Sequence, residues 1–143
     1  MITSKIAGWL LVGVAFVGLI DSAYLGINSL QGFVVPCGLS GGCDEVLNSS
    51  YSHLLGVSIS WFGFCFYGFV AACGLFSAFG FTKLLRFSLA ASVPAFIVTL
   101  YLLYVQAFTL KALCQYCLLS ALLVTLILGL HLLAQPWKLP LDV

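Results

Sequence analysis

Charged residues are scarce in this sequence of 143 residues, which contains five Lys and Arg and four Asp and Glu, so that 6% of it is charged and 63% is hydrophobic. A soluble domain carries about a quarter charged residues, and so few ionised side chains cannot cover a water-soluble globule. The net charge of +1, without a basic cluster, excludes a nucleic-acid partner. Two of the few carboxylates, Asp44 and Glu45, are adjacent, which does not suit hydrolytic chemistry. The composition therefore predicts an integral membrane protein.

Four apolar segments are long enough to cross a bilayer, which takes about 20 helical residues. We expect helices at about 6–30, 57–79, 87–107 and 112–134. They predict one all-α domain, residues 1–143, as a membrane four-helix bundle with a long extracytoplasmic loop at 31–58. Pro94 is expected to kink the third helix. A signal peptide is the alternative for the first segment, because Lys5 precedes it, but hydrophobicity resumes after Asp21 and no small-x-small cleavage site ends the run.

Basic residues indicate how the four helices are oriented. Lys5, the pair Lys83 and Arg86, and Lys138 fall on one side of a four-helix topology, and Lys111 falls on the other. Cytoplasmic loops carry the excess of Lys and Arg, so both termini are expected in the cytoplasm. The long loop and the start of the last helix then face outward together from a cell (inner or plasma) membrane.

The six cysteines divide into two classes by this topology. Cys37, Cys43, Cys114 and Cys117 fall on the outer side, whereas Cys65 and Cys73 lie within the second helix. We expect the second class to pack as small apolar residues. The first class includes Cys114-Gln115-Tyr116-Cys117, a C-x-x-C motif at a helix N-terminus, where residues three apart share one face. Unpaired N–H groups and the helix dipole favour a thiolate at this position.

The loop pair strengthens a redox interpretation of the C-x-x-C motif. Cys37 and Cys43 are six residues apart in a segment rich in Gly and Ser, which lets the loop bring them together or present one elsewhere. Thiol–disulfide exchange proceeds by thiolate attack through a mixed disulfide, so two facing pairs can relay electrons. The electrons need a sink at membrane depth, and a lipid-soluble quinone, either ubiquinone or menaquinone, is the obvious candidate.

Three stretches together resemble the vitamin K epoxide reductase family, with its prokaryotic branch the most similar. They are Pro36-Cys37 with Gly42-Cys43-Asp44-Glu45-Val46-Leu47-Asn48-Ser49-Ser50, the Cys114-x-x-Cys117 motif, and Asp21-Ser22-Ala23-Tyr24-Leu25. The resemblance covers essentially the whole chain and implies a four-helix bundle around a quinone. It implies that Cys117 faces the quinone, with Cys114 as its exchanging partner. Cys43 would attack the disulfide of that pair, and Cys37 would engage a partner protein.

The resemblance also has implications for the quinone site and the reaction. Ser49 matches a polar residue that the family places near the quinone. Vertebrate members carry a tyrosine and an asparagine where this chain has Ala121 and Ile59, which favours reduction of a ubiquinone, menaquinone or related naphthoquinone over epoxide reduction. Many bacterial relatives continue into a thioredoxin-like domain, whereas this chain stops at Val143. The expected partner is therefore a separate extracytoplasmic thioredoxin-fold protein of the DsbA type.

Aromatic residues at the start of the second helix could form the wall of a quinone pocket. They are Trp61, Phe62, Phe64, Phe66 and Tyr67, of which Phe62 and Phe66 are the candidates for quinone contact. Asp21 is either a functional intramembrane acid or an interfacial residue. His53 could assist a thiolate or a quinone proton but is expected to be a solvated loop residue, and His131 is expected to have an interfacial role.

Two other functions compete with a quinone-dependent thiol oxidoreductase. The four outer cysteines could form a metal-binding module, although structural zinc sites usually use two short C-x₂₋₄-C knuckles, and the spacing of Cys37 and Cys43 fits these poorly. The chain could instead be a membrane scaffold or transporter with a structural disulfide. A transporter would be expected to place polar residues or broken helices at the midplane, and these helices are almost uniformly apolar.

Overall fold

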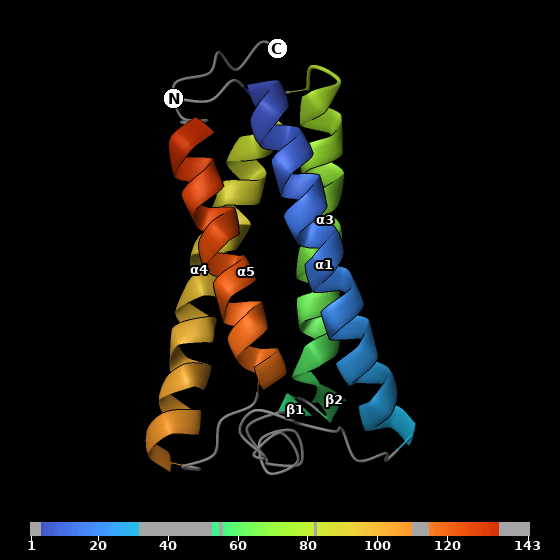
Figure 1. The fold of residues 1–143 in the computed structure, drawn as a ribbon, viewed down its shortest axis with the longest axis vertical. Coiled ribbons are helices and arrows are strands. Elements are labelled where there is room, and N and C mark those ends of the chain that lie inside the picture. The colour runs from blue at the N-terminus through green and yellow to red at the C-terminus, as the bar shows by residue number, and fades with distance from the viewer. Residues whose placement is uncertain (1–3, 32–52, 55, 82, 110–114, 135–143) are drawn as a thin grey trace.

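A computed structural model describes residues 4–31, 53–54, 56–81, 83–109 and 115–134. Its four long helices are α1 (Ser4–Gln31), α3 (Ile59–Ala78), α4 (Leu84–Tyr104) and α5 (Gln115–Ala134). A π-helical segment, η2 (Val105–Thr109), follows α4. Two short antiparallel strands, β1 (His53–Leu54) and β2 (Val57–Ser58), precede α3. The long helices lie side by side, with the two strands at one end of the bundle (Figure 1).

The described part of the chain contains four helices long and apolar enough to cross a membrane: Lys5–Gln31, Ile59–Ala78, Leu84–Thr109 and Gln115–Ala134. The prediction of an all-α, multi-pass membrane chain is therefore confirmed. The predicted loop at 31–58 falls mostly outside the described residues.

The helix boundaries have local causes. Ser58 ends β2 and caps α3, because its Oγ accepts a hydrogen bond of 3.4 Å from the Ser60 backbone N–H. Gly80, with a φ of +115°, follows α3 and takes a backbone conformation that L side chains rarely adopt. The next helix begins at Leu84, earlier than the expected residue 87, and continues through Pro94. Its end widens into η2, a π-helical turn that apolarity alone does not predict.

Glycines allow α1 and α3 to approach each other closely. A Cβ on Gly8 would lie 2.5 Å from the backbone oxygen of Gly74, and a Cβ on Gly74 would lie 2.8 Å from the oxygen of Gly8. Small residues at such contacts let membrane helices pack backbone to backbone, where lipid provides no hydrophobic driving force. The core continues from this contact through Leu11, Val70 and Ile127, all fully buried.

A buried hydrogen-bond network joins α4 to α5. His131 has no exposed surface, and its Nδ1 lies 2.8 Å from the Ile127 backbone oxygen. A carbonyl oxygen can only accept, so Nδ1 donates, and in the neutral ring Nε2 accepts from the Ser88 hydroxyl at 2.8 Å. The expected interfacial role of His131 was wrong, because this residue turns into the bundle and finds its partner on the neighbouring helix.

The contribution of this network can be measured with a double-mutant cycle. We expect His131→Leu and Ser88→Ala each to lower the free energy of unfolding in mixed micelles, with a coupling of about 0.6 to 2 kcal/mol. The reason is that each single change removes the same hydrogen bond. Strictly additive effects would contradict the hydrogen bond as a source of stability.

Candidate functional site

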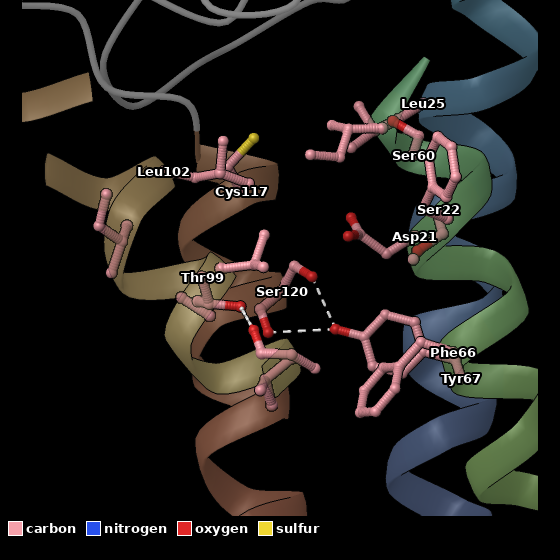
Figure 2. Close-up of a pocket in the computed structure, with 18 of the residues that line it drawn as sticks. Asp21, Ser22, Leu25, Ser60, Phe66, Tyr67, Thr99, Leu102, Cys117 and Ser120 are labelled. Atoms are coloured by element: carbon pink, nitrogen blue, oxygen red, sulfur yellow. Dashed lines mark hydrogen bonds between the residues drawn. The ribbon is translucent and has the colours of Figure 1, made fainter. Parts of the chain in front are cut away.

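A cavity of about 300 Å³ lies among the four helices, and residues of each helix line it. This volume is at the lower end of the range of about 300–1,000 Å³ that small-molecule sites occupy. The lining is predominantly apolar, and its polar side chains are few. Figure 2 shows the cavity between the side chains of α1 and α3 and those of α4 and α5. Such a chamber suits a flat, apolar molecule with a small number of polar atoms.

Cys117 lines this cavity from the first turn of α5 and is partly exposed. Ser120, Ala121 and Val124 line the cavity with it. Their spacing of three, four and seven residues from Cys117 places all four on one face of the helix. Cys117 therefore lies on the face of α5 that lines the cavity. It is also at the N-terminal end of α5, where the helix dipole is positive.

Tyr67 and Ser120 connect the two sides of the cavity. The Tyr67 hydroxyl is 2.6 Å from Ser120 Oγ and 3.1 Å from the Ser120 backbone oxygen. The Tyr67 side chain is 1% exposed, so its hydroxyl needs these partners. Figure 2 shows the pair spanning from α3 to α5. Sequence reasoning named Tyr67 only as a wall residue, although a tyrosine in an apolar span signals a hydrogen-bond partner nearby.

Asp21 lines the cavity from α1 and is 7% exposed, with its Oδ2 buried and without a hydrogen-bond partner among the described residues. Figure 2 shows its carboxyl group pointing from α1 into the space that Cys117 and Ser120 border from α5. Of the two interpretations of Asp21, the intramembrane one agrees with this position.

The chain is similar to known proteins over the helices that form this cavity. The model of the vitamin K epoxide reductase family matches residues 9–132. The chain belongs to this family. The matched range includes the whole cavity lining, from Asp21 to Val124.

The Thiol-disulfide oxidoreductase LTO1 of Arabidopsis thaliana is one relative, and its aligned part is 35% identical to this chain. The alignment covers 73% of this chain and 30% of the relative. The chain therefore spans less than a third of the length of that protein.

Three of the site residues predicted from the sequence line the cavity: Cys117, Phe62 and Phe66. The Phe66 ring also contacts the Tyr67 ring, with 5.3 Å between their centroids. Contact of the two phenylalanines with a quinone stays a prediction. The other candidates, Cys37, Cys43, Ser49 and Cys114, lie outside the described residues.

Four further residues discussed from the sequence have informative positions. Ile59 and Ala121, which stand where vertebrate family members are expected to have asparagine and tyrosine, both line the cavity. Cys73 is buried and Cys65 is exposed on the apolar helix α3, and neither lines the cavity. The two cysteines thus lie apart from the site that contains Cys117.

Proposed function

We propose that this chain is a membrane thiol–disulfide oxidoreductase that supports disulfide-bond formation. Electrons pass from an extracytoplasmic thioredoxin-fold partner to Cys37 and Cys43, then to Cys114 and Cys117, and on to a quinone. The observation that carries the proposal is the position of Cys117 on the wall of an apolar cavity inside a membrane bundle. Family membership and the relative named a thiol–disulfide oxidoreductase support the same reaction class.

The residues of the cavity fit a quinone. Its volume and apolar lining suit a planar ring, and Phe62 and Phe66 offer aromatic surface to that ring. Such a molecule, when bound, takes up two electrons and two protons. The dithiol of Cys114 and Cys117 releases two of each when it closes to a disulfide, so the atoms and electrons balance. The other members of the site hold the ring, with Ser49 as the proposed polar contact.

The apolar side chains of Ile59 and Ala121 favour quinone reduction over epoxide reduction. Both lie at the cavity wall and offer no hydrogen-bond donor to an epoxide oxygen. The substrate is accordingly a ubiquinone, a menaquinone or a related naphthoquinone.

We place the chain in a cell membrane, either an inner or a plasma membrane. The basic residues support an orientation in which both termini are cytoplasmic. Lys5 lies at the start of α1, Lys83 immediately precedes α4, and Arg86 lies in the first turn of α4. Figure 1 shows these segments at one end of the bundle and the start of α5 toward the other. Cys117 is the third residue of α5. An excess of Lys and Arg marks the cytoplasmic side, so the start of α5, with Cys117, faces outward.

A single-turnover reaction tests this proposal without requiring knowledge of the partner. The protein is reduced, freed of reductant and mixed anaerobically with ubiquinone carrying one isoprenoid unit, and its thiols are then trapped by alkylation. We expect the loss of quinone, followed by its ultraviolet absorbance, to match mole for mole the appearance of a disulfide between Cys114 and Cys117. Unchanged spectra of both ubiquinone and menaquinone, with both thiols still open to alkylation, would refute the proposal.

A further inference from the structure

The Asp21 carboxyl is the one buried side-chain group in the described part of the chain that has an oxygen without a hydrogen-bond partner. Other buried polar side chains are paired: Tyr67 with Ser120, and His131 with Ser88. Burial of an unpaired polar group costs about 1 to 3 kcal/mol by protein mutational data. An ionisable residue retained inside a membrane bundle at such a cost is a candidate for function.

Within the described part of the chain, no ion pair accounts for Asp21. Among the described residues, none of those lining the cavity is a Lys, an Arg or a His. The carboxyl instead points into the cavity, whose opposite wall holds Cys117 (Figure 2). A ring occupying the cavity would therefore have Cys117 on the α5 side and the Asp21 carboxyl on the α1 side.

The other groups that face Asp21 are less suited to exchange protons. Among the described lining residues, the titratable ones besides Asp21 are Tyr67 on α3 and Cys117 on α5, and the polar ones that α4 and η2 add, Thr99 and Gln106, do not titrate. The Tyr67 hydroxyl is held by Ser120, and the Thr99 hydroxyl donates to the Ala95 backbone oxygen at 2.8 Å. Cys117 itself supplies electrons in the proposed function.

We propose that Asp21 is the intramembrane acid that delivers a proton to the quinone during its reduction, an inference that rests on the proposed function. The Asp21 carboxyl gives its proton to a ring oxygen as the electron pair leaves the dithiol. One of the two protons released by Cys114 and Cys117 returns to Asp21, and the other reaches the second ring oxygen. One disulfide and one quinol result, and Asp21 ends the turnover as it began.

The experiment compares the wild type with Asp21→Asn, Asp21→Glu and Asp21→Ala, and uses Asp142→Asn as a control that removes a carboxyl near the end of the sequence. Two quantities are measured with ubiquinone carrying one isoprenoid unit: its dissociation constant, from quenching of tryptophan fluorescence, and the single-turnover rate. Asp21→Asn is expected to lower the rate on the order of 100-fold, since general acids contribute roughly that much. Its dissociation constant stays close to that of the wild type, and Asp21→Glu recovers much of the rate.

Chemical rescue separates proton delivery from a structural role. In Asp21→Ala the removed carboxyl leaves room for a small acid, so formate is expected to restore the rate in proportion to its concentration, whereas formamide does not. A wild-type rate in Asp21→Asn would overturn the inference. It would also be overturned if Asp21→Asn lost rate and bound the quinone more weakly while formate failed to restore the rate of Asp21→Ala. A wild type that reduces no quinone would instead refute the proposed function itself.

Discussion

Cys117→Ser is expected to reduce quinone no faster than a protein-free solution, while binding the quinone as the wild type does. A serine hydroxyl has nearly the size of a thiol but cannot form a disulfide, so the change removes the electron donor and leaves the cavity wall intact. The measurement is the anaerobic single-turnover absorbance change, together with the dissociation constant of the quinone.

The chain provides a matched control for this substitution. Cys65 lies on α3, is exposed on the outside of the bundle and does not line the cavity. Cys65→Ser therefore makes the same chemical change within a membrane span and is expected to keep the wild-type rate. Equal losses in both variants would indicate a general effect of serine in the membrane. An active Cys117→Ser protein would show that another group donates the electrons.

Gly8→Ala is expected to have the largest effect on stability, because the added methyl group meets backbone on the neighbouring helix. Its Cβ would lie 2.5 Å from the Gly74 oxygen and 3.0 Å from the Ala78 nitrogen, and neither atom can rotate away. Helices α1 and α3 must then separate along their contact. Overpacking of this kind costs about 1–3 kcal/mol, and backbone contacts belong at the upper end. The measurement is the free energy of unfolding in mixed micelles.

Gly13→Ala provides the control on the same helix. A Cβ at Gly13 meets nothing within 4 Å, so this variant gains helix propensity of about 0.5–1 kcal/mol without a clash. The two Gly→Ala changes on α1 should thus shift stability in opposite directions. Stability changes of the same sign and size would show that α1 and α3 do not pack as closely as described.

The membrane spans could be predicted from the sequence because they depend on length and apolarity alone. Four runs of apolar residues predicted four helices, and the structure contains them. The C-x-x-C motif together with the loop pair predicted a redox site at the start of the last helix, and the family resemblance singled out Cys117 as the cysteine that faces the quinone. These inferences needed no knowledge of how each helix is rotated.

Helix rotation accounts for what could not be predicted. The spans are apolar on nearly all sides, so they have no polar face to show which residues turn inward. The burial of His131 depends on a partner from another helix, Ser88, which lies 43 residues away in sequence. The direction of Asp21 depends on how α1 is rotated within the bundle. The π-helical segment η2 at the end of α4 likewise has no counterpart in the pattern of apolar residues.

The most direct test of the central claim is an electron balance during anaerobic turnover. The reconstituted protein is supplied with an excess of a reduced DsbA-type thioredoxin-fold protein and of ubiquinone, and both disulfides formed in that protein and quinol formed are counted. We predict one quinol for each disulfide, with no product of either kind when the membrane protein is Cys117→Ser. Disulfides that accumulate without quinol, or quinol that accumulates without disulfides, would contradict an electron path from thiols to quinone through this bundle.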